Sequence, residues 1–294
     1  NRKVKDSGDT ALQTRWKKSL IKYGYKTVAS NVKVTDKKYT PYKDAVPSDR
    51  EKYKKTLAAL PGGGATPMAA ALDLTRDMAE RYDERNSLSD ISNNLHFLMR
   101  LTMNDLPADA RILCVGVGTG VDILALASHF PGWTFTGVDP SGEMLEVGRR
   151  RLAEAGLLGR CTLVEGYVED VDAGGFDAVV SLLVAHFVKR EERGAFYSAV
   201  HDRLREGGTF LSAEISADLD APHFPAMLGD WKQVHSLMGA TPDGLANLPA
   251  VLRETLSVVS PRETEGLWEQ AGFASPVPFF QSFMIRGWHA KKGR

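Results

Sequence analysis

The feature that most constrains the fold is a regular alternation of strand-like and helix-like stretches between residues 111 and 215. Short apolar runs, such as RILCV at 111–115 and FDAVVSL at 176–182, alternate with longer amphipathic stretches such as 141–156. Apolar strands joined by helices are typical of a mostly parallel sheet with helices on both faces. The pattern therefore predicts a doubly wound α/β fold.

After Ile215 the alternation stops, and the next two periodic stretches both have a helical period. We interpret them as a helical lid inserted at about 219–258, before the last strands of a seven-stranded sheet. Further helices are expected on either side of the alternating region, and the apolar run at 279–292 is expected to form the final pair of strands. The helices predicted outside the alternating region cover 69–85, 89–103 (with Ser89 or Asp90 as N-cap), 224–239, 245–256 and 261–273.

The charge distribution divides the chain near residue 62. Residues 1–62 hold 16 Lys and Arg against 6 Asp and Glu, although the whole chain carries no net charge. We therefore predict a basic segment over 1–62 that is a fusion or leader, a linker over 63–68, and one domain over 69–294. The interleaved Lys and Tyr of 17–26 would suit a nucleic-acid tether, but a solvated appendage is the favoured interpretation.

Composition also limits the location of the protein and its use of metals. No apolar run approaches the roughly 18 residues of a membrane span, and no signal peptide is visible. The two cysteines, Cys114 and Cys161, lie in apolar stretches without the spacing of metal ligands. These observations predict a cytoplasmic protein that is not bound to a membrane and has no metal site.

A glycine-rich turn follows the first strand of the alternating region. Gly116, Gly118 and Gly120 alternate with Val117 and Thr119, and Asp139 ends the next strand, nineteen residues after Gly120. In open α/β sheets ligands bind at the carboxyl ends of the strands, and an acid there can accept both ribose hydroxyls of an adenosine. The dinucleotide fingerprint requires a glycine at its sixth position, where this chain has Val121. The spacing thus favours a different adenosine cofactor.

The strand and turn ILCVGVGTG resemble those of the class I methyltransferases that use S-adenosylmethionine (SAM), and the resemblance extends over about residues 75–292. It implies a Rossmann-like fold, SAM as the cofactor and S-adenosylhomocysteine (SAH) as the product. It also implies that the cofactor lies against the glycine turn, the ends of the second and third strands, and the end of the fourth. The residues implied in these contacts are Gly116, Gly118, Gly120, Asp139, Pro140, Met144, Tyr167, Val168, Glu169, Ser181 and Leu182.

Two positions depart from the family pattern. The family often has an acid where Cys114 stands, near the ammonium group of the cofactor, and commonly has Asp where Tyr167 stands. Asp122, in the first turn of the following helix, is the candidate to replace the acid missing at Cys114.

Methyl transfer from a sulfonium is an in-line displacement that depends mainly on alignment of the reactants. Where the acceptor needs a base, His186 is the candidate, because it follows the end of the fourth strand. Apolar and aromatic residues of the insertion and the final strands are expected to line a pocket for a small, partly apolar acceptor. The pocket candidates are Phe224, Met227, Trp231, His235 and Phe283.

Within the class, the inserted helices and the segment DISNNLHFLM resemble the carboxy-SAM synthase branch, which acts in tRNA wobble uridine modification. That branch has a Lys-Arg pair where our alignment places Leu248 and Pro249, so ordinary methyl transfer is favoured. The alternatives kept open are a carboxy-SAM synthase-like enzyme and a module that binds SAM or SAH without turnover. By analogy alone, the inserted helices are a candidate homodimer interface.

Overall fold

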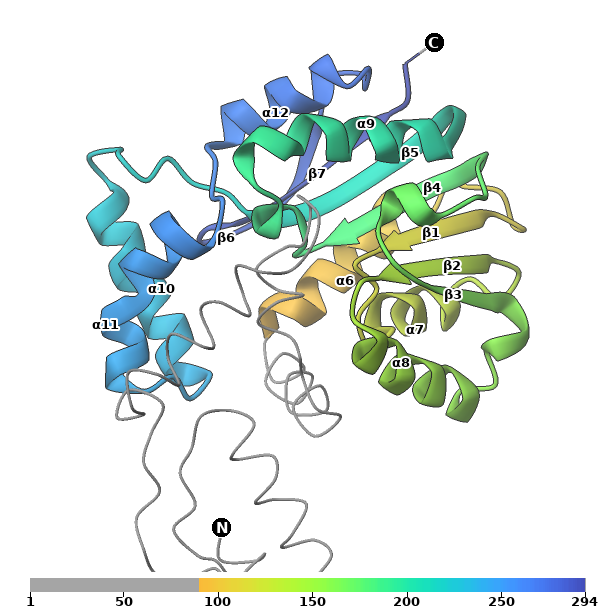
Figure 1. The fold of residues 1–294 in the computed structure, drawn as a ribbon, viewed down its shortest axis with the longest axis horizontal. Coiled ribbons are helices and arrows are strands. Elements are labelled where there is room, and N and C mark those ends of the chain that lie inside the picture. The colour runs from red at the N-terminus through yellow and green to blue at the C-terminus, as the bar shows by residue number, and fades with distance from the viewer. Residues whose placement is uncertain (1–89, 294) are drawn as a thin grey trace, which may run out of the picture. The chain divides into compact units, whose positions relative to one another are not determined.

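The computed structural model describes residues 90–293 of the 294-residue chain. Its centre is one seven-stranded sheet with the strand order β3-β2-β1-β4-β5-β7-β6 (Figure 1). The first five strands in this order are parallel, and β7 and β6 are antiparallel to their neighbours. The strands are β1 (Arg111–Val115), β2 (Thr134–Asp139), β3 (Cys161–Glu165), β4 (Phe176–Leu182), β5 (Leu204–Ile215), β6 (Val277–Ser282) and β7 (Ile285–Lys291).

Helices cover both faces of the sheet and extend past one end of it (Figure 1). Helices α9 and α12 lie on one face, whereas α6, α7 and α8 lie on the other. Helices α10 and α11 stand beyond the carboxyl ends of the central parallel strands. The helices are α6 (Asp90–Thr102), α7 (Val121–Ala127), α8 (Gly142–Glu154), α9 (Arg193–Arg203), α10 (Phe224–Leu237), α11 (Pro242–Ala250) and α12 (Pro261–Gln270).

Single turns of helix complete the connections between these elements. They are 3₁₀ turns, apart from one π-helical turn that continues α11. The 3₁₀ turns are η2 (Leu158–Arg160), η3 (Val168–Asp170), η4 (Ala185–Phe187) and η5 (Arg190–Glu192), and the π-helical turn is η6 (Val251–Thr255).

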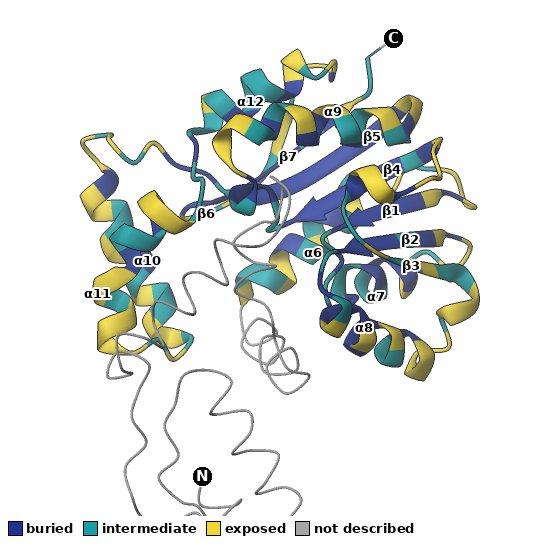
Figure 2. Cartoon of the chain, in the orientation of Figure 1, coloured by how far each residue is buried: buried dark blue, intermediate teal, exposed yellow. Residues whose placement is uncertain are grey.

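The buried residues form two apolar clusters, one on each face of the sheet (Figure 2). The cluster on the α6, α7 and α8 face includes Met99, Ile123 and Leu145, and it continues into the insertion through Trp231 and Leu252. The cluster on the other face gathers side chains of α9, α12 and the strands beneath them. The predicted doubly wound sheet with a helical insertion before its last strands is thus confirmed.

The boundaries differ from the predicted ones mainly in the insertion. The second inserted helix begins at Pro242, earlier than predicted, because the Thr241 hydroxyl caps it by accepting a hydrogen bond from Gly244 N–H at 3.2 Å. Pro249 lies inside this helix and lacks the N–H that an α-helix needs, and the π-helical turn η6 begins two residues later, at Val251. The segments predicted at 1–62, 63–68 and 69–85, together with Ser89, lie outside the described residues.

Candidate functional site

The glycine turn between β1 and α7 is pressed against the loop that follows β4. Gly116, Gly118 and Gly120 have φ angles of 68°, 51° and 81°, a region in which glycine is favoured. A Cβ atom at Gly116 would lie 2.3 Å from Cγ2 of Val184, which belongs to that loop. The first glycine is therefore required both by its backbone angle and by close contact.

The carboxylate of Asp139 lies at the end of β2, beside the turn. Its Oδ2 accepts a hydrogen bond from Gly118 N–H at 2.9 Å, and its Oδ1 accepts one from Ser141 N–H at 2.8 Å. Burial raises the pKa of Asp139, although the hydrogen bonds from Ser141 and Gly118 act in the opposite direction. A carboxylate offers about four lone-pair sites, so roughly two remain for a ligand such as a ribose diol.

Asp122, the candidate for the ammonium group, is paired with a residue that the sequence pattern did not single out. His96 of α6 lies with Nε2 at 2.7 Å from Oδ1 of Asp122, and both side chains are largely buried. Burial lowers the pKa of His96, but the hydrogen bond and charge of Asp122 outweigh that effect and raise it above the ordinary value. Helix α6 is therefore tied to the first turn of α7 by a charge-assisted hydrogen bond.

Cys114 is a core residue on β1. Its side chain is 1% exposed and belongs to the apolar cluster on the α7 face. Burial raises the pKa of the Cys114 thiol, and the negative charge of Asp122 adds to this effect. The thiol therefore stays protonated and cannot replace a carboxylate as the partner of a cation.

The other residues implied in cofactor contact lie along the same edge of the sheet. Met144 and Val168 are buried, Pro140 and Tyr167 are half-buried, and Glu169 is exposed. The side chain of Met144 underlies the turn, because a Cβ atom at Gly118 would lie 3.2 Å from its methyl carbon. Burial raises the pKa of Tyr167, and the nearby carboxylates of Asp170, Asp139 and Glu169 raise it further.

The end of β4 is buried and leads into a strained residue. Ser181 and Leu182 are both buried, and the Ser181 hydroxyl has no hydrogen-bond partner among the described residues. Leu183 has a φ of 58°, and its N–H donates to Ala213 of β5 at 2.6 Å. Such left-handed angles are costly for residues other than glycine and tend to occur at functional sites.

His186 lies in η4, just beyond this residue, with 3% of its surface exposed. Its Nδ1 accepts a hydrogen bond from Ile215 N–H at 3.2 Å, which assigns the proton of the neutral ring to Nε2. Burial, together with the charge of Arg193, lowers the pKa of His186 to about 3. The role of this residue as a general base stays a prediction, and in this tautomer neither ring nitrogen is free to accept a proton.

The low pKa of His186 makes the stability of the fold depend on pH. The unfolded chain binds a proton on this residue near pH 6.5, whereas the folded chain binds it only near pH 3. The free energy of unfolding should therefore fall as the pH decreases from 6.5 towards 3, by roughly 3 kcal/mol from this residue at pH 4.5. Urea unfolding of the wild type and the His186→Gln variant between pH 4.5 and 7.5 measures the difference. Equal slopes with pH in the two proteins would contradict the prediction.

Three of the five pocket candidates lie close together. The ring of Trp231 is 5.1 Å from His235 and 6.5 Å from Phe283, measured between centroids. Phe283 joins β6 to β7 with a φ of 53° and is 41% exposed. Phe224 is buried in the core of the insertion, whereas Met227 is half-buried against the same cluster.

The structure also contains a buried ion pair that the sequence pattern did not predict. Arg193 of α9 and Glu214 of β5 lie 2.6 Å apart, and their side chains are 0% and 1% exposed. The acidic residue in the otherwise uncharged run TFLSAEI is the one sequence signal for this pair. Arg193, within KREERGAF, looks like any surface arginine.

Two kinds of feature are absent from residues 90–293. In this range no three His, Cys, Asp or Glu side chains gather as a metal-ligand group. No helix within it is both long and apolar enough to cross a membrane.

The chain is similar to known methyltransferases. The family described as "Methyltransferase domain" matches residues 112–208, from β1 into β5. A carboxy-S-adenosyl-L-methionine synthase from Campylobacter concisus is 23% identical over 211 residues, which cover 70% of this chain and 88% of that protein. A ubiquinone/menaquinone biosynthesis C-methyltransferase from Rhodopseudomonas palustris is 31% identical over 159 residues, or 51% of this chain and 61% of that protein.

Solved structures extend the similarity to the whole fold. The S-adenosylmethionine-dependent methyltransferase SibL, in its apo form, superposes with a TM-score of 0.55 at 18% identity. The match covers 97% of this chain and 85% of that one. At this level of identity the match supports the architecture of the sheet and its helices.

Proposed function

Because the chain contains a class I S-adenosylmethionine-dependent methyltransferase domain, we propose that it transfers the methyl group of SAM to a small-molecule acceptor. The observation that carries the cofactor site is the carboxylate of Asp139, which two backbone N–H groups hold beside the glycine turn. The acceptor is proposed to bind under the inserted helices, near Trp231, His235 and Phe283.

The described residues fit an adenosine cofactor at this edge of the sheet. The two lone-pair sites left on Asp139 match the two hydroxyl groups of a ribose. The glycines at 116 and 118 let the turn adopt left-handed backbone angles while Val184 and Met144 pack closely against it. Pro140 and Tyr167 are half-buried on the same edge and are proposed to border the adenine.

SAM supplies an electrophilic methyl group on a sulfonium, so this chain mainly has to align the acceptor and exclude water. In our proposal, Asp139 orients the ribose, and the His96–Asp122 pair lies near the ammonium group in place of the acid missing at Cys114. Ser181 and Leu182, at the end of β4, border the reacting methyl group. The aromatic side chains of the insertion are suited to face a sulfonium cation.

Calorimetric titration of the full chain with SAM and SAH tests the cofactor. We expect both ligands to bind. If neither SAM nor SAH binds at millimolar concentration, the proposal is wrong. Incubation with isotope-labelled SAM and a metabolite extract, followed by mass spectrometry, then identifies the labelled acceptor. Label found in nucleic acid rather than in a small molecule would refute the proposed substrate class.

Removal of the Asp139 carboxylate should weaken cofactor binding strongly. Hydrogen bonds to charged groups contribute about 1.5–3 kcal/mol each, so loss of two such bonds predicts at least a tenfold rise in the Kd for SAH. Calorimetry on the Asp139→Ala variant measures this rise. The matched control is Glu165→Ala, since Glu165 pairs in register with Asp139 at the end of β3 but is exposed. Affinities within twofold of each other would contradict the assignment.

A carboxy-SAM synthase-like activity is the second candidate, favoured by the 88% coverage of the Campylobacter relative. The additional carboxylate of such a product requires a cation, for which arginine is well suited. Our alignment places Leu248 and Pro249 where that branch has its basic pair, and Leu248 is 8% exposed in the core of the insertion. Mass spectrometry of the cofactor that co-purifies with the protein separates the candidates, because carboxy-SAM is heavier than SAM.

A further inference from the structure

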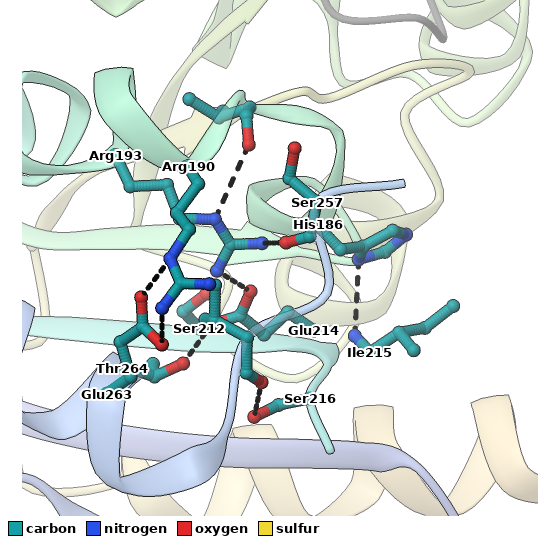
Figure 3. A network of polar contacts seen from close by, with 12 residues as sticks. His186, Arg190, Arg193, Ser212, Glu214, Ile215, Ser216, Ser257, Glu263 and Thr264 are labelled. Carbon is teal, nitrogen blue, oxygen red and sulfur yellow. Dashed lines mark hydrogen bonds and ion pairs between the residues drawn. The ribbon is translucent and has the colours of Figure 1, made fainter. Parts of the chain in front are cut away.

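Arg193, the first residue of α9, makes contacts with three separate parts of the chain (Figure 3). Its Nη1 donates to Glu214 Oε2 at 2.6 Å, and its Nε donates to the carbonyl oxygen of Val188 at 3.4 Å. Its Nη2 donates to the carbonyl oxygen of Ser257. The guanidinium thus joins the sheet, the loop after β4 and the end of the insertion.

The partner carboxylate is held by further contacts. Oε1 of Glu214 accepts hydrogen bonds from the Tyr197 hydroxyl at 3.2 Å and the Thr264 hydroxyl at 3.1 Å. Taking two charges out of water costs about as much as their mutual attraction returns, so a buried ion pair is weak evidence of a stabilising role. In this structure the ion pair fixes the position of the Arg193 guanidinium, and thereby the backbone carbonyl groups that it binds.

The backbone groups that bind Arg193 lie in the loop after β4 and at the end of the insertion, which border the proposed binding site of the methyl acceptor. The N–H of Ser257 donates to the carbonyl oxygen of His186 at 2.8 Å, so the same residue that accepts from Arg193 also joins the end of the insertion to the loop after β4. Two residues later, Val259 O accepts hydrogen bonds from Ala217 N–H at 3.1 Å and from the Ser216 hydroxyl at 2.9 Å. The two ends of the insertion are therefore joined at its base, beside the Arg193 contact.

A second arginine makes the insertion a coherent body above that base. Nη1 of Arg253 donates to Oδ1 of Asp220 at 3.0 Å, and Nη2 donates to the carbonyl oxygen of Leu219 at 2.5 Å. The guanidinium carbon lies 5.6 Å from the centre of the Phe224 ring. Because η6 is thus joined to the start of the insertion, we expect a displacement at Ser257 to move α10 and α11 together.

We propose that Arg193 is a positioning residue, which sets the inserted helices and the loop after β4 relative to the edge of the sheet where methyl transfer takes place. This assignment rests on the proposed function for the location of the transfer, whereas the anchoring itself stands on the contacts above. The planar guanidinium presents several donors in a fixed fork, which fits three acceptors in different directions. A lysine ammonium at this position would keep the charge beside Glu214 but could not span Val188 and Ser257.

The test is hydrogen exchange of the full chain, followed by mass spectrometry of its peptides. The double variant Arg193→Met with Glu214→Leu removes the anchor without leaving an unpaired buried charge, and Arg193→Lys keeps the charge. In both we expect amide exchange at least tenfold faster within 224–255 and 183–188, with unchanged rates in α7 and α8. The Kd for SAH is expected to stay within threefold of the wild-type value.

The matched control is Arg190→Met. It removes a surface ion pair near Arg193, in which two nitrogens of Arg190 lie 2.7 and 2.8 Å from the two carboxylate oxygens of Glu263. It should leave exchange within 224–255 unchanged. The proposal would be overturned if the amides of the insertion exchange at the wild-type rate in both Arg193 variants. It would also be overturned if exchange becomes faster to the same extent in α9, α12 and the insertion. If the double variant does not fold, the Arg193→Lys result decides. A wild-type protein that fails to bind SAH would refute the proposed function but would leave the exchange result intact.

Discussion

Replacement of Gly116 by alanine is expected to destabilise the fold and to abolish measurable binding of SAH. The φ of 68° costs an L-residue about 1–2 kcal/mol, and the new Cβ atom would lie 2.3 Å from Val184 Cγ2. Relief of that overlap by moving the loop or the turn adds about 1–3 kcal/mol. The total expected loss in the free energy of unfolding is about 2–5 kcal/mol, measurable by urea titration, with SAH binding followed by calorimetry.

Gly156 provides a matched control for the backbone angle. It has nearly the same φ, 70°, but a Cβ atom there would meet no atom within 4 Å. Gly156→Ala should therefore cost only the backbone strain and leave SAH binding unchanged. Addition of Val184→Ala to Gly116→Ala should recover the part of the loss that comes from the overlap. If Gly116→Ala and Gly156→Ala lower the free energy of unfolding equally, the contact with Val184 does not contribute to the effect.

Removal of the Glu214 carboxylate is expected to destabilise the fold strongly, because it leaves a buried charge unpaired. Glu214→Ala deprives the Arg193 cation of its partner, and breaking a buried pair in this way costs about 3–5 kcal/mol. The Tyr197 and Thr264 hydroxyls lose their acceptor at the same time. Urea or thermal unfolding of the variant measures the loss.

The comparison variants separate the buried charge from the loss of a side chain. Glu263→Ala removes the half-buried partner of the exposed Arg190 and should change the stability by about 1 kcal/mol, far less than loss of the fully buried Glu214. Arg193→Met combined with Glu214→Leu removes both charges and should recover most of the loss. If the double variant is as unstable as Glu214→Ala, packing rather than an unpaired charge explains the effect.

The fold was largely predictable because its signals are local. The alternation of apolar strands and amphipathic helices follows from the periodicity of residues that are adjacent in sequence, and it predicted the first five strands, while the apolar run at 279–292 predicted the last two. The glycine turn and the acid at Asp139 could be predicted for the same reason, because a turn after a strand is specified by neighbouring residues. The π-helical turn that follows Pro249 was not predicted.

Tertiary structure alone decided which distant groups are paired. His96 meets Asp122 across 26 positions of sequence, and Arg193 reaches Ser257 across 64. The same packing made Cys114 an inert core thiol and placed His186 where burial lowers its pKa. Sequence alone thus determined the sheet, the turn and the class of cofactor, because these depend on short-range patterns. The anchoring of the insertion depends on charges that become partners only when folding excludes water from both.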